Sequence, residues 1–367
     1  MFAAEMKKIW TFQTFLVIIV FSILFFFSFL YQWTKPFQWE GDSLSVRLDI
    51  LSEWIAQYGN IIDQAEFEEI EDGYEAILYQ AWSAIGGNSY FEENGVKDYR
   101  DYLNYEQNAI SGYEGYDYSI YSKMRSLFAE NTGYSHIWFQ EYENVIRQYK
   151  AYGEERNSIL PLEVFVYTGN YMVYLAIWCL VCVFFVSAPV MVNDRENHIV
   201  AAQYTSRIGK KTYRIQYACT MLSAFIVASA IIVIGILAWK TTGAFMFAGS
   251  DMSSFLNTEV FVISVTYGKY TVLFIIMVYL LTLGVSSILF CLSAHSPNMT
   301  SMLLKAIPAL AGGILIVLLM QNALCESNLI YRLTGRKYCE VTVAVVILIV
   351  GILLNLSSYK ALYKKDC

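Results

Sequence analysis

Six long apolar runs constrain the fold of this chain more than any other feature. They lie at residues 9–31, 164–192, 217–239, 271–294, 302–324 and 341–358. A helix needs about 20 apolar residues to cross the hydrocarbon core of a membrane. None of the runs alternates polar and apolar residues as the strands of a membrane barrel do. The runs therefore predict an all-α polytopic membrane protein with six transmembrane helices.

The first run, at residues 9–31, invites comparison with a cleaved signal peptide, because Lys7 and Lys8 precede it. Its apolar stretch is longer than about 15 residues, and it ends without the small residues that a signal peptidase requires. We therefore expect it to be retained as the first transmembrane helix.

The net charge of −7 conceals two regions of opposite charge. Residues 32–163 contain 24 acidic and nine basic residues, a net charge of about −15, so the rest of the chain carries about +8. Apolar residues recur at helical spacing within this insertion, as at Leu44, Leu48, Leu51 and Ile55. The sequence predicts an N-terminus and first helix at 1–31, an acidic, mainly helical extracellular domain at 32–163, and five further transmembrane helices at 164–367.

Basic residues orient the predicted helices, because loops on the cytoplasmic side carry an excess of lysine and arginine. If the N-terminus is cytoplasmic, eleven basic residues flank the helices inside, and the two short outer loops carry five. This bias predicts that both termini are cytoplasmic. A pI near 5.2 and the lack of a basic stripe argue against a nucleic-acid partner.

A second feature of the insertion is its tyrosine content. Between residues 90 and 121 the chain carries Tyr99, Tyr102, Tyr105, Tyr113, Tyr116 and Tyr118. One interpretation is a contact surface for an amphipathic ligand, since tyrosine provides a large contact area at low entropic cost. The other interpretation is a helical domain that uses tyrosine at its half-buried positions.

No residue pattern in the sequence indicates catalysis. The three histidines are far apart, no metal-binding motif occurs, and Cys179 and Cys182 lie inside an apolar run, which favours a packing role. No phosphate-binding loop is present, because the position five residues before Gly209 is Tyr204 and not glycine. We expect no enzymatic activity, no metal and no cofactor in this chain, so energy for transport would come from another subunit or an ion gradient.

Polar residues at the predicted outer ends of the helices suggest two further features. Asn170, Gln321 and Asn322 are candidates to line a pathway, and interhelical hydrogen bonding is the alternative, which we expect for Asn355. Cys325 and Cys339 flank the last outer loop. They either form a disulfide that closes a loop of about 15 residues, worth about 3 kcal/mol, or remain two free thiols.

The segment 193–214 between the second and third runs is the most informative. Asn193 or Asp194 is suited to cap a short helix, with Glu196 in its first turn, and Gly209 is suited to end it. We expect this helix to lie flat on the cytoplasmic surface, connected at both ends to transmembrane helices.

This segment resembles the first cytoplasmic loop of ABC-2 type permease subunits of bacterial ABC exporters. In that family the loop carries a glutamate, a short apolar helix, a Ser-Arg pair and a lysine entering the next helix. Glu196, Ser206, Arg207 and Lys210 match, whereas His198 and its neighbours stand where a glycine usually follows the glutamate. The resemblance extends over the six-helix topology, about 235 residues.

The resemblance implies a permease that works with separate ATP-binding subunits and a second permease subunit, the same or related. ATP and Mg²⁺ would be bound by the partner ATPase, and the location would be the bacterial plasma membrane. The substrate would be peptide-like or amphipathic, such as an antimicrobial peptide, a drug or a lipid-like molecule. The residues that would couple to the ATPase are Glu196, Gln203, Tyr204, Arg207, Lys210 and Lys211.

Two alternatives belong to other functional classes. One is a membrane receptor or sensor whose extracellular domain binds a ligand and relays the signal to a cytoplasmic partner. The other is a gradient-driven carrier, which the sequence disfavours because no Asp or Glu lies in the centre of any apolar run.

Overall fold

The computed structural model describes residues 1–38, 43–85, 87–132, 136–199 and 209–364. All regular structure in these residues is helical, apart from three isolated β-bridges. The chain forms two compact units, which are described separately. Unit 1 comprises Met1–Gln38, Leu160–Ser253 and Asn257–Cys367, and unit 2 comprises Trp39–Ile159 and Ser254–Leu256.

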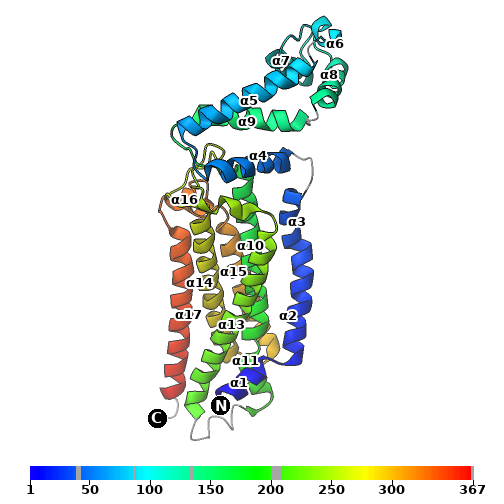
Figure 1. Cartoon of the computed structure of the whole chain (residues 1–367). Coiled ribbons are helices and arrows are strands. Elements are labelled where there is room, and N and C mark those ends of the chain that lie inside the picture. The colour runs from blue at the N-terminus through cyan, green and yellow to red at the C-terminus, as the bar shows by residue number, and fades with distance from the viewer. Residues whose placement is uncertain (39–42, 86, 133–135, 200–208, 365–367) are drawn as a thin grey trace. The chain divides into compact units, whose positions relative to one another are not determined.

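Unit 1 is a bundle of long apolar helices, which confirms the predicted helical membrane fold. Among the described residues six helical stretches are long and apolar enough to cross a membrane, so the chain is a multi-pass membrane protein. Helix α1 and the last turn of α17 lie at the same end of this bundle (Figure 1). The helices of unit 1 are α1 (Phe2–Ile9), α2 (Phe12–Phe25), η1 (Phe26–Leu30), α3 (Tyr31–Thr34), η2 (Lys35–Gln38), α10 (Leu162–Ser187), α11 (Val190–Glu196), α13 (Gly209–Lys240), η3 (Ala244–Gly249), α14 (Tyr267–Ala294), α15 (Met299–Leu319), α16 (Leu329–Thr334) and α17 (Cys339–Lys364).

Some helices begin or end at residues inside the apolar runs, because a local capping interaction sets the boundary there. The first membrane helix begins after Thr11, whose hydroxyl accepts a hydrogen bond from the amide of Thr14 at 3.2 Å. Residues 2–9 therefore form a separate short helix, α1, which the sequence pattern did not reveal. The second run also divides, because α10 ends at Ser187 and Pro189 precedes a new helix, α11.

Helix α10 forms the core of the bundle. In its most apolar stretch 72% of the residues are buried inside the protein, against 11% for the first membrane helix and 22% for α15 and α17. A helix that is apolar on all sides and still exposed is suited to lipid, not water. The outer helices therefore present apolar faces to the membrane.

Helices α14 and α17 approach closely through two glycines. A Cβ atom at Gly351 would lie 2.8 Å from both the carbonyl oxygen of Gly284 and the Cβ of Ser287. Small residues of this kind allow membrane helices to pack backbone against backbone. Asn355 crosses the same contact, since its amide donates to the Ser287 carbonyl at 2.7 Å. Asn355 thus makes the interhelical hydrogen bond expected from its sequence position.

Unit 2 is helical, as predicted for the insertion, and its last residues pair with the segment between α4 and α5. The amide of Ile62 donates to Asn157 at 2.9 Å, and the amide of Ile159 donates to Asn60 at 3.0 Å. The insertion expected at 32–163 corresponds to the narrower range 39–159, because residues 35–38 belong to unit 1 as η2. Its helices are α4 (Ser43–Tyr58), α5 (Gln64–Ile85), α6 (Ser89–Glu93), α7 (Tyr99–Ile110), α8 (Tyr118–Thr132) and α9 (His136–Tyr152).

The tyrosines of unit 2 divide into two groups. Tyr99, Tyr102 and Tyr105 are buried and lie on one face of α7, where the ring of Tyr102 stacks on Phe128 at a centroid distance of 5.5 Å. Tyr113, Tyr116 and Tyr118 are exposed in and after the turn that follows α7. The packing interpretation therefore holds for the first group only.

Candidate functional site

Helix α11 lies at the end of the bundle where α1 begins (Figure 1). A serine hydroxyl and an apolar contact hold it there. The first amides of a helix lack intrahelical partners. Here Ser293 of α14 accepts hydrogen bonds from the amides of Met191 and Val192, at 3.1 Å and 3.3 Å. The Met191 side chain packs with Tyr213 and Phe290 in a buried cluster. This short helix is therefore fixed against α13 and α14.

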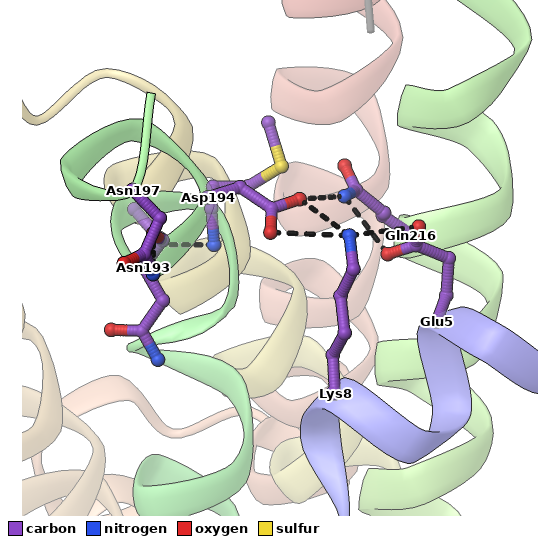
Figure 2. A network of polar contacts seen from close by, with 8 residues as sticks. Glu5, Lys8, Asn193, Asp194, Asn197 and Gln216 are labelled. Atoms are coloured by element: carbon purple, nitrogen blue, oxygen red, sulfur yellow. Dashed lines mark hydrogen bonds and ion pairs between the residues drawn. The ribbon is translucent and has the colours of Figure 1, made fainter. Parts of the chain in front are cut away.

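Asp194 of α11 connects to α1 and α13 through a buried polar network (Figure 2). The Lys8 ammonium lies 3.1 Å from Asp194 Oδ2 and 3.0 Å from Glu5 Oε1. The Gln216 amide donates to Asp194 and, at 3.0 Å, to Glu5. Glu5, Asp194 and Gln216 are each at most 6% exposed. We call these four residues together with Arg195 and Glu196 the α11 junction.

The charges of the α11 junction compensate one another locally. Burying a carboxylate costs free energy unless it is paired and hydrogen-bonded. Two buried carboxylates share the Lys8 ammonium and the Gln216 amide here. Burial alone would lower the pKa of Lys8, but hydrogen bonds from its ammonium to Glu5 and Asp194 and the charges of both outweigh this effect. The pKa of Lys8 is therefore raised, and the side chain stays cationic at neutral pH.

Arg195 and Glu196 extend the junction to two more helices. Arg195 donates to the carbonyl oxygens of Ser296 and Ala294 at the end of α14, the latter at 2.7 Å. Glu196 accepts a hydrogen bond at 2.8 Å from the amide of Met299, the first residue of α15. A cation at a helix C-terminus and an anion at an N-terminus both complement the helix dipole. Three consecutive charged residues of α11 therefore contact different helices of the bundle.

The helix predicted in the segment 193–214 lies only partly within the described residues, and its first expected positions belong to α11. The helix α11 begins at Val190, so Asp194 lies inside it and does not cap it, and Glu196 is its last residue and not in its first turn. Gly209 is the first residue of α13, and residues 200–208 before it lie outside the described part of the chain. The apolar residues before Asn193 pack against the bundle, and this tertiary contact decides where the helix starts.

The residues predicted to couple to an ATPase are only partly described. Glu196 belongs to the α11 junction, and Lys211 is exposed in the first turn of α13. Gln203, Tyr204 and Arg207 lie outside the described residues, as does most of the helix expected over 196–204. The backbone of Lys210 lies in α13, but its side chain is outside the described part.

The three amides proposed to line a pathway gather at one place in unit 1. The Gln321 amide donates to Asn170 Oδ1 at 2.7 Å, so α10 and the segment after α15 are linked. The side-chain oxygen of Asn322 lies beside Gly169 of α10, 3.8 Å from where a Cβ atom would be. The interhelical hydrogen bond is thus observed, and a role in transport stays a prediction.

Cys325 and Cys339 are free thiols in the structure, which is the second of the two alternatives drawn from the sequence. Cys325 is buried, and its backbone pairs with Phe261 in an isolated bridge. The sulfur of Cys339 lies 3.3 Å from the hydroxyl of Thr334. Burial raises the pKa of the Cys325 thiol, which keeps it protonated.

Sequence reasoning did not predict the Glu5–Lys8–Asp194–Gln216 network. The sequence shows only Glu5 and Lys8, three residues apart before the first apolar run, and Gln216 at the start of the third run. Neither signal shows that these residues meet. In the described part of the chain, no group of three or more potential metal ligands comes together.

The fold and the α11 junction define a polytopic helical membrane protein with an embedded polar network at the end that carries both termini. Comparison of the chain with protein-family models, with curated proteins and with solved structures finds no match.

Proposed function

We propose that this chain is the permease subunit of an ATP-driven exporter of the ABC-2 type. In this proposal the chain forms half of a transport pathway and lacks its own ATPase. Two ATP-binding subunits, which bind ATP and Mg²⁺, would dock at the end of the bundle that carries the termini. A second permease subunit, the same or related, would complete the pathway.

The observation that supports this proposal best is the set of contacts made by α11. Asp194 contacts α1 and α13, Arg195 contacts the end of α14, and Glu196 contacts the start of α15. A force applied to this short helix would therefore reach four other helices directly. Packed side chains and hydrogen-bond networks of this kind carry energetic coupling between distant sites.

The proposed orientation follows from charge. The basic excess near the termini favours the cytoplasm for that end of the bundle. The acidic insertion follows the first membrane helix, so in this proposal it faces outward from a bacterial plasma membrane. An acidic outer unit attracts cationic molecules, which agrees with a peptide-like or amphipathic substrate.

The first experiment identifies the partner. The tagged full-length chain is purified in a mild detergent, and stoichiometric partners are identified by mass spectrometry. We expect an ATP-binding cassette subunit at a one-to-one ratio and ATPase activity in the complex. A signalling protein in its place would support the receptor alternative and overturn the proposal.

The second experiment tests coupling at α11 in the purified complex. The variants Asp194→Asn, Arg195→Gln and Glu196→Gln each remove one connection, and basal ATPase activity is compared with substrate-driven transport. We expect the rate of substrate transport to fall at least fivefold while the complex stays assembled. Lys305→Gln is the matched control, because Lys305 belongs to α15 and donates to the His295 carbonyl at the same end of the bundle. Unchanged transport in all three variants would contradict the proposed coupling role.

A further inference from the structure

Unit 2 contains a groove with a volume of about 300 Å³ between α5, the start of α7 and α9. Aromatic side chains form much of its wall: Tyr74, Tyr79 and Trp82 from α5 and Tyr99 from α7. Tyr79 is 79% exposed, whereas Tyr74 and Tyr99 are buried at the base. The groove is thus open at one side and aromatic at its floor.

The charged groups of the groove are predominantly acidic. Four carboxylates line it, against two cations, Arg100 and Lys150. Both cations already have partners, because Lys150 pairs with Glu71 and Arg100 lies 3.7 Å from Glu75. Of the other two carboxylates, Asp98 caps α7 by accepting from the amide of Asp101 at 2.8 Å.

Glu143 is the fourth carboxylate, and it differs from the other three. Within the residues that the structure describes, Glu143 forms no ion pair and caps no helix. It lies on α9 near the hydroxyls of Tyr74 and Tyr99, and its negative charge contributes to raising the pKa of both, after burial as the main cause. A partly buried anion that lacks a cation attracts one from solution.

The Tyr99 hydroxyl provides an independent observation. The residue is 6% exposed, and its buried hydroxyl has no partner at ordinary hydrogen-bond geometry in the described part of the chain; the Tyr74 hydroxyl is a close polar neighbour. Leaving such a group unsatisfied costs about 1–3 kcal/mol. A ligand that donates an N–H to this oxygen would recover that loss.

We propose that this groove binds an organic cation, a primary ammonium or guanidinium group carried on an aromatic or aliphatic body. The cation would lie between the Glu143 carboxylate and the Tyr99 hydroxyl, and the body would pack on Tyr79 and Trp82. Cations are attracted to aromatic faces as well as to carboxylates. The site stands independently of the proposed transport function, because binding requires neither an ATPase nor a second permease.

The experiment compares three probes that share an indole-ethyl body and differ in charge. Tryptamine carries an ammonium, indole-3-propionamide is neutral and indole-3-propionate carries a carboxylate. Calorimetric titration into the full-length chain in lipid nanodiscs, at low salt, gives each affinity. We expect tryptamine to bind at least tenfold more tightly than the propionate, with the amide between them. Equal affinities, or no measurable binding of tryptamine, would overturn the proposal.

Variants distinguish the groove from a general effect of the acidic surface. We expect Glu143→Gln to weaken tryptamine binding at least fivefold and Tyr79→Ala to weaken it about two- to fivefold. Arg100→Gln removes a competing cation and should strengthen binding. Glu114→Gln is the control, since this exposed acid of unit 2 lies outside the groove and its loss removes the same charge. Tyr79 is largely exposed, so that variant tests the site without disturbing the fold. An equal effect of Glu114→Gln and Glu143→Gln would refute the site.

Discussion

Lys8 and Asp194 form an ion pair, 3.1 Å between Nζ and Oδ2, across 186 positions of sequence. The carboxylate is only 6% exposed, whereas the lysine side chain is 38% exposed. The pair therefore joins a helix that precedes the first membrane span to the short helix that follows the second. It also neutralises a charge that the bundle would otherwise bury alone.

Replacing Lys8 by methionine should destabilise unit 1 by about 2 kcal/mol. Loss of the ammonium leaves Asp194 and Glu5 buried without a cation, and a fully buried pair broken in this way costs about 3–5 kcal/mol. Because Lys8 is partly exposed, the loss is smaller. The apparent Tm in detergent measures the effect. Lys7→Met removes an exposed lysine of the same helix and should change Tm little. Equal Tm values for both variants would contradict the structural role of the pair.

The same pair should not make stability depend on pH in the neutral range. The pKa of Lys8 is raised in the folded protein, so its contribution is complete below the ordinary lysine pKa of about 10.4. It is lost only as pH rises through the raised value. The Tm difference between wild type and Lys8→Met should therefore persist from about pH 8 to pH 10 and shrink only above that range. A difference that disappears below about pH 9 would mean that the pKa of Lys8 is lowered instead.

Alanine substitution should have opposite consequences at Gly351 and Gly312. At Gly351 an added Cβ would lie 2.8 Å from the Gly284 backbone, so α14 and α17 must separate and Tm should fall. At Gly312 an added Cβ meets nothing within 4 Å, and alanine favours a helix by up to about 1 kcal/mol over glycine. Tm measurements on both variants test the contact, and a loss of stability at Gly312 as large as that at Gly351 would contradict it.

The sequence predicted the helical membrane fold because each apolar run carries its own signal of length and hydropathy. It also predicted the helical insertion and the hydrogen-bonding role of Asn355. It missed α1 and the start of a short helix at Val190, since both depend on tertiary contacts. Helix α1 contacts Gln216, Cys219 and Ser223 of α13. The spacing of these three positions places them on one face of α13. A polar stripe on a helix does not indicate which other helix will pack against it. The groove of unit 2 was equally hidden, because it combines residues from three helices.

Asn355 and Tyr213 should be energetically coupled across α13 and α17. The Tyr213 hydroxyl donates to Asn355 Oδ1 at 2.9 Å in a buried site. Interhelical hydrogen bonds in membrane proteins contribute about 0.6 kcal/mol on average and at most about 1.7 kcal/mol. A double-mutant cycle with Tyr213→Phe and Asn355→Leu should yield a coupling energy in this range. Strict additivity of the two effects would show that the bond contributes nothing.

The two thiols on either side of α16 should react differently with a maleimide. Cys325 is buried and its pKa is raised by burial, so it should stay unmodified until the protein unfolds. Cys339 is half-buried at the start of α17 and should react in the folded protein. Peptide mapping after labelling of the full-length chain measures both, with Cys339→Ser as the control for site assignment.

Mapping without reductant adds a sharper outcome: a linked Cys325–Cys339 peptide would replace the free-thiol arrangement with the disulfide. If a membrane-impermeant maleimide labels Cys339 in intact cells, this end of the bundle faces outward, as we predict from the basic excess at the opposite end.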